Sequence, residues 1–385
     1  MLTVRGISPF DNSIIELDIN SSCIAKKTVC SANDQIRAYV SPGFIDIQVN
    51  GYMGMDYSSA TLQPEHLESM VRSMAATGTT QHCPTIVTAS QDRILRNLEL
   101  IRTTRDASPL LQHAIPGIHV EGPYISGADG ARGTHDAAFV RNPDLNEFKE
   151  WQDAAKGLVK IVTLAPETKG ALRFIEEVAA TGVVVAIGHT QAKPAEILKA
   201  VEAGARLSTH LGNGSPTMIN RLRNHIWPQL ACDKLVASII TDGDHLPAEV
   251  VKTYTRAKGL DRLVLISDVA PLGGFKKGLY KWGNVDVEVF DDGHIGLPGT
   301  EILAGAAHML DWDILHFMKY SHVTLAQSIR LCTINAAKLL NLSSVSLDFA
   351  QGSVATLVSF TYDTHDTALQ IEKTLIAGQV VFEHQ

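Results

Sequence analysis

VVVAIGHT (residues 183–190) is a run of apolar residues that ends in Gly-His-Thr. A continuous apolar run of this kind is typical of a strand buried on both faces, as in a parallel sheet. Seven further segments share this form, with a polar or glycine-rich end: GFIDIQVNG (43–51), TTQHCPTIVTAS (79–90), IPGIHVEGPYI (115–125), KIVTLAPE (160–167), RLSTHLGNG (206–214), VASIITDGDH (236–245) and RLVLISDVAP (262–271). The sequence therefore predicts eight buried strands.

Helix-like segments lie between many of these strands, several opening with Ser or Pro and closing on Gly. They cover residues 63–78, 90–106, 166–182, 193–204 and 246–259, and two more are expected at about 304–319 and 324–340. Strands that alternate with amphipathic helices indicate a parallel sheet covered by helices. An open doubly wound sheet would normally carry G-x-G-x-x-G after its first strand, and the sequence has none. We therefore predict a closed (β/α)8 TIM-like barrel over residues 42–346.

The two ends of the chain have a different pattern of short alternating runs and turn residues. We predict that residues 1–41 and 347–385 pair into one small β-sandwich domain. A further pair of short strands is expected in KWGNVDVEVFDDGHIGL (281–297), where Asp292-Gly293 indicates a hairpin turn.

Composition excludes several classes of function. The 385 residues are 45% hydrophobic and 19% charged, which is ordinary for a globular protein. The formal charge of -8 is spread without long runs of one sign, so neither a nucleic-acid groove nor a membrane-binding patch is expected, and no apolar run approaches the roughly 20 residues of a membrane span. Five widely spaced cysteines without Cys-x-x-Cys disfavour a disulfide framework and a thiolate zinc site, and indicate a reducing cytoplasm.

Four chemically compatible side chains lie where predicted strands end, which is where a barrel of this kind gathers its reactive groups. They are Glu121, His189, His210 and Asp268. A lone buried histidine is usually a hydrogen-bonded core residue, but the joint occurrence on separate strand ends favours a site. One carboxylate and two imidazoles suit Zn²⁺ or another divalent metal with a position open for water.

This ligand set is compatible with a hydrolytic centre. A metal lowers the pKa of bound water to roughly 7, and a carboxylate such as Asp268 could take the proton and later hand it to a leaving amine.

An ordered series of motifs then resembles a known family. PGFID-x-Q-x-NG, PT-x-x-T, H-x-EGP, GTH, LAPE, GH, THL-x-N, DG-x-H, SD-x-x-P and LAG follow one another over nearly the whole chain. In this order the sequence resembles the N-acetylglucosamine-6-phosphate deacetylases of the amidohydrolase superfamily. The resemblance implies a metal-dependent barrel that converts N-acetylglucosamine 6-phosphate to glucosamine 6-phosphate and acetate.

The resemblance also implies roles at the centre. Gln48 and Asn50 match the Gln-x-Asn of single-metal members, where two-metal relatives carry His-x-His, and neutral amides are weak ligands for a transition metal. A capping or loop role for both amides is the alternative. Asp268 matches the general base and acid, and His135 matches a histidine that polarises the acetamide carbonyl, although surface histidines are also common on such glycine-rich loops.

Further matches concern the substrate. Asn213, Gly214, His245 and Leu303 match positions that hold the sugar or its phosphate, and Arg221 matches an arginine that pairs with the phosphate. A solvated loop arginine is the alternative for Arg221. The family resemblance also implies a homodimer in which a neighbour's loop reaches the pocket.

His119 shares the strand face of Glu121 by the period of two. We expect it either to orient the metal ligands or to pack in the core.

The segment GNGSPTMINRLRNHIWPQ (212–229) departs from the family pattern, because glycine replaces both the aromatic residue before Asn213 and the alanine after it. A deacetylase of a different N-acyl amino sugar or amino compound is therefore the alternative, and a barrel that binds without catalysis is the alternative from another class. Zinc is the default metal, since a Glu-His-His set accepts several divalent ions.

Overall fold

The structure is a computed structural model that describes residues 1–385 except 32–35, 283–284, 300–302, 344, 346 and 385. Eight parallel strands form one sheet in the order β14-β13-β12-β11-β10-β9-β8-β5. They are β5 (Phe44–Val49), β8 (Thr79–Val87), β9 (Ile118–Glu121), β10 (Val159–Leu164), β11 (Val184–Ile187), β12 (Leu207–Ser208), β13 (Val236–Ile239) and β14 (Leu263–Leu265). Seven of them lie within a predicted run, and β10 begins one residue before its run, which starts at Lys160.

The sheet closes on itself at its two edge strands. Val49 at the end of β5 forms a parallel bridge with Val269, which follows β14, and the Asp268 backbone N–H donates to the Gln48 carbonyl at 3.1 Å. The predicted barrel is therefore confirmed.

The barrel is stable as a closed layer because its strands have apolar residues on both faces. Ile45, Ile161, Leu207 and Val264 belong to the cluster packed inside the strands. A larger cluster fills the space between the strands and the surrounding helices, and it includes side chains such as Leu67. Parallel strands need this burial on both sides, which explains their near-continuous apolar sequences.

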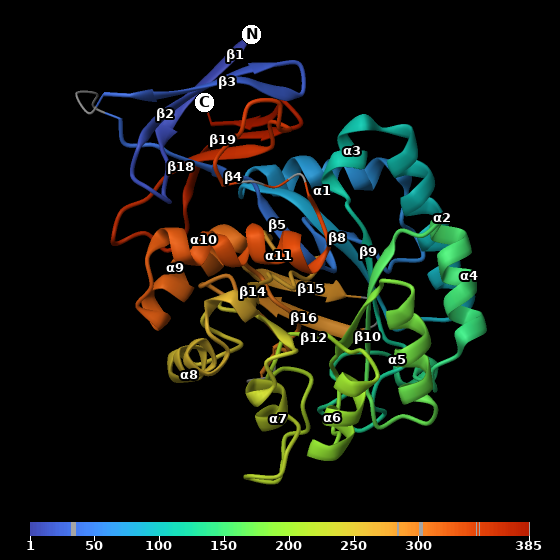
Figure 1. The fold of residues 1–385 in the computed structure, drawn as a ribbon. Helices are drawn as coiled ribbons and strands as arrows, with labels where there is room; N and C mark the ends of the chain where they lie inside the picture. Colours follow the sequence, from blue (N-terminus) through green and yellow to red (C-terminus); the bar gives the residue numbers. More distant parts are fainter. Residues whose placement is uncertain (32–35, 283–284, 300–302, 344, 346, 385) are drawn as a thin grey trace.

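Helices cover the outside of the barrel (Figure 1). They are α1 (Pro64–Ala75), α2 (Gln91–Ala107), α3 (Pro109–Ala114), α4 (Leu145–Ala155), α5 (Ala171–Ala180), α6 (Pro194–Glu202), α7 (Ile226–Ala231), α8 (Ala248–Lys258), α9 (Leu310–Ser321), α10 (Leu325–Leu331) and α11 (Ile334–Leu339), with short 3-10 turns η1 (Ala137–Phe139) and η2 (Leu260–Arg262). Proline stands in the first turn of α1, α3 and α6, where its missing N–H has no helical partner to lose.

Two helix predictions needed correction. The helix expected at 304–319 begins only at Leu310, because Ala304 donates to Ile295 and Ala306 bridges Val269 in extended conformation. The helix expected at 324–340 is divided into α10 and α11. Thr333 lies between them with φ -126° and ψ -88°, outside the helical region.

Both ends of the chain form one seven-stranded sheet beside the barrel (Figure 1). The order is β20-β19-β18-β4-β1-β2-β3, with β1 (Leu2–Ile7), β2 (Ile14–Asn20), β3 (Cys23–Cys30), β4 (Tyr39–Pro42), β18 (Leu357–Thr361), β19 (Gln370–Ile376) and β20 (Gln379–Glu383). The antiparallel pairing of β4 with β18 joins the two termini. The predicted small β domain from both ends is confirmed, while its boundaries at residues 41 and 347 stay a prediction.

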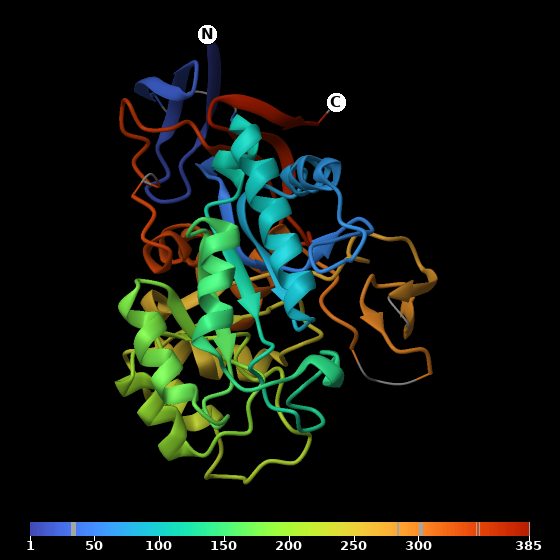
Figure 2. The same ribbon diagram turned by 90° about the vertical axis from the view of Figure 1, so that its right-hand side faces the viewer.

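Smaller strands extend from the barrel. β15 (Gly278–Trp282), β16 (Val285–Val289) and β17 (Ile295–Gly296) form a three-stranded sheet that projects to one side (Figure 2), and β6 (Gly51–Tyr52) pairs with β7 (Met55–Asp56). The predicted turn lies between β16 and β17, where Gly293 has φ +93° and donates to the Phe290 carbonyl. Residues 283–284 of the predicted strand pair lie outside the described part of the chain.

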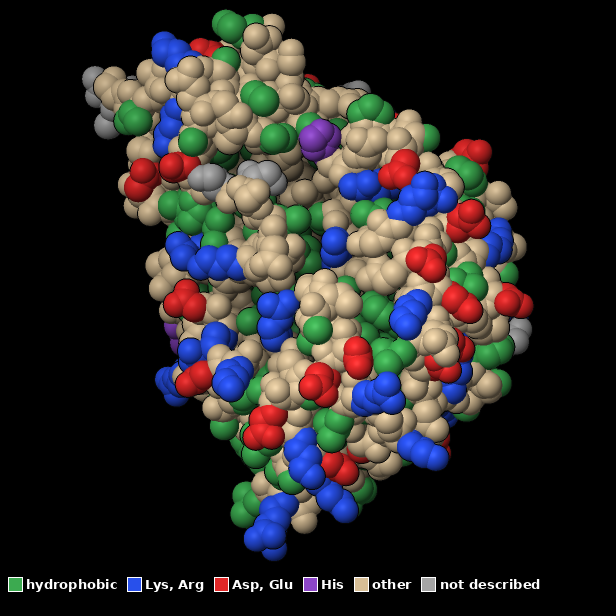
Figure 3. All heavy atoms as spheres, turned by 45° about the vertical axis from the view of Figure 1, so that its right-hand side comes forward, with side chains coloured by type: hydrophobic (Ala, Val, Ile, Leu, Met, Phe, Trp, Pro, Cys, Tyr) green, Lys and Arg blue, Asp and Glu red, His purple; other side chains and the backbone are tan. Residues whose placement is uncertain are grey.

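The surface carries acidic and basic side chains side by side, without a broad area of one sign on the face seen in Figure 3. Within the described residues, no helix is long and apolar enough to cross a membrane.

Candidate active site

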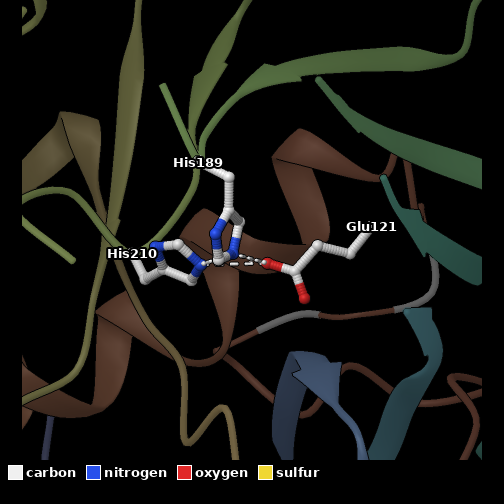
Figure 4. Close-up of side chains that lie close together, drawn as sticks. All are labelled: Glu121, His189 and His210. Atoms are coloured by element: carbon white, nitrogen blue, oxygen red, sulfur yellow. Dashed lines mark hydrogen bonds and ion pairs between the residues drawn. The ribbon is translucent and has the colours of Figure 1, made fainter. Parts of the chain in front are cut away.

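Three side chains from separate strands converge on one point. The Glu121 Oε1 atom lies 3.2 Å from His189 Nε2 and 2.9 Å from His210 Nε2, and the two Nε2 atoms are 3.1 Å apart (Figure 4). All three side chains are buried. A tetrahedral ion with ligands at about 2.0–2.2 Å places its ligand atoms about 3.3 Å apart. The spacing and chemistry of this donor set therefore fit one divalent ion.

The backbone at the strand ends is what aims these side chains. His189 has φ +50° and His210 has φ +30°, and Asp268 has φ +51°. Residues other than glycine rarely adopt the left-handed region, and such conformations cluster at functional sites where the surrounding structure enforces them. Three of the four residues predicted from the strand ends share this feature.

The charges of the cluster depend on one another. Burial alone would raise the pKa of Glu121, but the hydrogen bonds and charges of His189 and His210 hold that pKa well below its ordinary value. Burial would lower the pKa of His210, and the Glu121 carboxylate raises it instead. Glu121 is therefore an anion that needs positive charge beside it, as a bound cation would supply.

The two amides of the first strand face the carboxylates of the site. Gln48 Nε2 donates to Glu121 Oε1 at 2.9 Å, and Asn50 Nδ2 donates to Asp268 Oδ1 at 2.8 Å. Each amide thus donates an N–H to a carboxylate oxygen, which can only accept while it is ionised. Gln48 lies buried within β5 and Asn50 directly follows that strand, and each amide has a specific partner in the site.

Asp268 stands beside this cluster at the end of β14. Removal of its carboxyl group from bulk water, together with the negative charge of Glu121, raises the pKa of Asp268 to about 6. A carboxyl group with such a pKa can accept and return a proton near neutral pH.

His135 lies against the same cluster although it comes from the loop after β9. Its Nε2 atom is 3.2 Å from His189 Nε2, and its Nδ1 atom is 2.7 Å from Thr88 Oγ1. Burial lowers the pKa of His135 to about 3, so its imidazole is neutral. The structure thus places His135 at the centre rather than on the surface.

Asn213 and Gly214 lie next to the cluster. The Asn213 backbone donates to the His210 carbonyl at 2.9 Å, and its buried Nδ2 atom has no hydrogen-bond partner in the described structure. Gly214 has φ +57°, and a Cβ there would come within 2.8 Å of His189 Nδ1. A glycine at position 214 is therefore required by both the backbone and the close approach to His189.

His245 is held by a buried carboxylate. Asp242 Oδ2 lies 2.7 Å from His245 Nδ1, and Asp242 Oδ1 accepts the His245 backbone N–H at 2.9 Å. Burial would lower the pKa of His245, but the hydrogen bond and charge of Asp242 raise it, with a further contribution from Asp268. His245 is thus suited to carry a positive charge near Asp268.

Arg221 and Leu303 are less closely tied to the centre. Arg221 is exposed on the loop 212–225, and its carbonyl accepts from Trp227 Nε1 at 3.3 Å. Leu303 is half-buried and bridges Gly296 of β17. No hydrogen bond or ion pair between described residues joins Arg221 to His245 or Asn213, and its part in the site stays a prediction.

His119 has partners outside the ligand cluster. Its Nε2 atom lies 2.7 Å from Thr163 Oγ1, which lies 2.7 Å from Thr209 Oγ1, and its Nδ1 atom lies 3.3 Å from the Ile47 carbonyl. Burial lowers the pKa of His119 to about 4. It is a neutral, hydrogen-bonded residue of the barrel interior, in line with the core alternative.

Sequence reasoning gave no role to two residues that contact the site. Asp242 supports His245, and Thr88 contacts His135. Asp242 belongs to the motif DG-x-H, three positions before His245, so this spacing was the available signal. Thr88 belongs to PT-x-x-T but lies 47 positions from His135, so only the motif itself pointed to it.

Comparison with known proteins gives a consistent result. The Amidohydrolase family model matches residues 39–381. The N-acetylglucosamine-6-phosphate deacetylase of Bacillus subtilis (strain 168) is 31% identical over 89% of this chain and 84% of its own length, and the human enzyme of that name is 30% identical over 89% and 83%.

Solved structures agree. A mutant N-acetyl-D-glucosamine-6-phosphate deacetylase from Mycobacterium smegmatis, in complex with N-acetyl-D-glucosamine-6-phosphate, has a TM-score of 0.85 at 28% identity and covers 98% of this chain and 97% of its own. The N-acetylglucosamine-6-phosphate deacetylase of Thermotoga maritima has a TM-score of 0.84 at 25% identity, with full coverage of both chains.

Proposed function

The chain belongs to the N-acetylglucosamine-6-phosphate deacetylases of the amidohydrolase family, and on this premise we propose that it hydrolyses N-acetylglucosamine 6-phosphate to glucosamine 6-phosphate and acetate. The observation that carries the proposal is the convergence of Glu121, His189 and His210 beside Asp268 and His135. This arrangement combines a cation site with a proton acceptor and a neutral hydrogen-bond donor.

The residues of the chain divide the reaction between them. A divalent ion held by Glu121, His189 and His210 would lower the pKa of water to roughly 7 and polarise the amide carbonyl. Asp268 takes the proton of the attacking water and returns it to the amine as the carbon–nitrogen bond breaks. His135 donates a hydrogen bond to the carbonyl oxygen, on which negative charge develops.

We assign the ion as zinc and its number as one per chain. Two imidazoles and one carboxylate with an open position are a common catalytic zinc set. Gln48 and Asn50 support a single ion because each donates an amide N–H to a carboxylate, an arrangement that offers no strong ligand for a second metal.

Substrate recognition is proposed for Asn213, Gly214, His245, Leu303 and Arg221. His245 and Arg221 would meet the phosphate, since a charged imidazole and a guanidinium both favour it. The exposure of Arg221 supports a homodimer in which this arginine reaches the neighbour's pocket. Large apolar side chains are also exposed on the same loop and the helix after it: Met218, Ile219, Leu222 and Trp227.

Localisation in the reducing cytoplasm is part of the proposal. All five cysteines are free, which fits that compartment.

A substrate panel tests the function. Purified zinc-loaded protein is assayed for acetate release from N-acetylglucosamine 6-phosphate, from unphosphorylated N-acetylglucosamine and from other N-acetylated amino sugars. We expect the phosphorylated compound to have the highest kcat/KM. If an unphosphorylated compound is turned over faster, N-acetylglucosamine 6-phosphate is not the preferred substrate. If none of the tested compounds releases acetate, the proposal of amide hydrolysis is rejected.

A further inference from the structure

Thr88 supports His135 from the end of β8. The Thr88 side chain is buried, its Oγ1 atom lies 2.7 Å from His135 Nδ1, and its backbone N–H donates to the same nitrogen at 3.4 Å. A backbone N–H can only donate, so Nδ1 acts as an acceptor. A neutral imidazole that accepts at Nδ1 carries its proton on Nε2.

The ring that packs against His135 has a fixed tautomer as well. His189 Nδ1 lies 2.9 Å from the Ala131 carbonyl, which can only accept, so Nδ1 of His189 carries a proton and its Nε2 presents a lone pair. In the ligand cluster this lone pair belongs to the ion, so the His135 Nε2–H, whose nitrogen is 3.2 Å from His189 Nε2, is left to donate to the substrate. A proton on His135 Nδ1 would set N–H against N–H at Thr88.

The Thr88 backbone and the Ala131 carbonyl therefore fix the protons of the two rings, on Nε2 of His135 and on Nδ1 of His189, which leaves the His189 Nε2 lone pair for the metal. We propose that Thr88 is a positioning residue that fixes the proton of His135 on Nε2, so that the imidazole donates to the acetamide carbonyl oxygen of the substrate. This proposal rests on the function proposed above. No covalent bond changes at Thr88, because its part is to select one tautomer.

The packing around Thr88 leaves room for its hydroxyl group. A Cβ at Gly122 would lie 2.3 Å from Thr88 Oγ1, and Gly122 has φ +76°. Glycine at position 122 thus admits the hydroxyl beside His135. This contact links three motifs that are far apart in sequence, PT-x-x-T, H-x-EGP and GTH.

Nitrogen NMR of histidine in the zinc-loaded protein without substrate tests the tautomer directly. We expect His135 to show its proton on Nε2 in the wild type and in Thr88→Ser, and a mixture of the two tautomers in Thr88→Val, which keeps the shape but removes the hydroxyl. Thr80→Val is the matched control, because Thr80 is buried in β8, the strand that Thr88 follows, and its hydroxyl donates to the Phe44 carbonyl.

Kinetics with N-acetylglucosamine 6-phosphate give the second measurement. Because the wrong tautomer cannot donate to the developing oxyanion, Thr88→Val should lower kcat by about tenfold to a hundredfold with KM changed by no more than about twofold. Thr88→Ser should stay within about threefold of the wild type, and Thr80→Val should match the wild type in kcat.

Two results would overturn the proposal: a wild-type His135 protonated on Nδ1, or a Thr88→Val variant with unchanged tautomer and kcat. The wild-type spectrum decides the matter even if Thr88→Val does not fold. If the wild type releases no acetate, the proposed function fails but the tautomer assignment does not. The NMR spectrum reports the tautomer of His135 without any turnover.

Discussion

The metal-ligand cluster and the loop 212–225 are two parts of one site with opposite character. Glu121, His189 and His210 are buried and joined by contacts of 2.9–3.2 Å, whereas Arg221 is exposed. The barrel of a single chain thus brings together the groups that we propose for bond cleavage. The arginine that we propose for recognition of the substrate anion lies on a segment that faces solvent.

The difference lies in what holds each part in place. Closed strands fix the ligand cluster through parallel hydrogen bonds and a packed apolar interior, so its geometry changes little without unfolding. The loop is held by local turns such as the Asn220 side chain, which accepts from the backbones of Leu222 and Arg223. Changes to the cluster should therefore affect chemistry and stability together, and changes to the exposed part of the loop around Arg221 should affect substrate preference alone.

Removal of the metal should have the largest effect. Glu121→Gln removes the anionic ligand, so we expect loss of bound zinc and no measurable turnover. Wild-type protein at a thousandfold excess of zinc over Kd should be stabilised by about 4 kcal/mol relative to the apoprotein. Metal analysis and thermal unfolding with and without zinc check this, and Glu68→Gln, at a half-buried residue paired with Arg72 away from the cluster, serves as control. Full activity in a metal-free variant would contradict the cluster's role.

Asp268→Asn should separate chemistry from metal binding. The substitution keeps the size of the side chain but removes the proton acceptor, so kcat should fall by about 10²- to 10⁴-fold. Zinc content should equal that of the wild type. Near-normal turnover would reject Asp268 as the base, and lost zinc would show that Asp268 supports the ion instead.

Arg221→Ala should change recognition without changing chemistry. Loss of a charge-assisted hydrogen bond of about 1.5–3 kcal/mol predicts a KM for the phosphorylated substrate about 10- to 100-fold higher, with kcat retained. Turnover of the unphosphorylated sugar should be unaffected, and Arg223→Ala on the same loop is the matched control. An equal effect on both substrates would contradict a phosphate contact.

Mixing two variants tests whether Arg221 acts across subunits. In a heterodimer of Asp268→Asn and Arg221→Ala chains, one pocket has an intact Asp268 from one chain and Arg221 from the other. We expect the mixture to regain a phase with the low wild-type KM. Arg221 acting within its own chain would leave the mixture with only the high KM.

Asp242→Asn should have the smallest effect, and one that depends on pH. Because Asp242 raises the pKa of His245, the imidazolium and its attraction for an anion persist above pH 6.5 and are lost as pH rises through the raised pKa. The variant lacks this carboxylate, so its KM should begin to rise at a lower pH, by several-fold near neutrality. We would measure KM against pH for the wild type and for Asp242→Asn. If the two profiles coincide, Asp242 does not set the charge of His245.

Much of the fold and part of the site could be read from single residues and their spacing. Eight apolar runs with polar ends specified the barrel, because burial on both faces requires that pattern wherever a parallel strand occurs. Glu121, His189, His210 and Asp268 could be named from the strand ends alone. The turn at Gly293 followed from local backbone preference, since Asp-Gly favours it irrespective of distant contacts.

Only the tertiary structure decided how these groups meet. Gln48 donates to Glu121 across 73 positions of sequence, and His210 reaches the same carboxylate across 89. The positive φ angles of His189, His210 and Asp268 and the division of residues 324–340 into two helices depend on distant neighbours. The contacts of Thr88 with His135 and of Ala131 with His189 do so as well. Periodicity specifies which face of an element is buried, but hydrogen-bond direction and strained backbone depend on atoms that only closure of the barrel brings together.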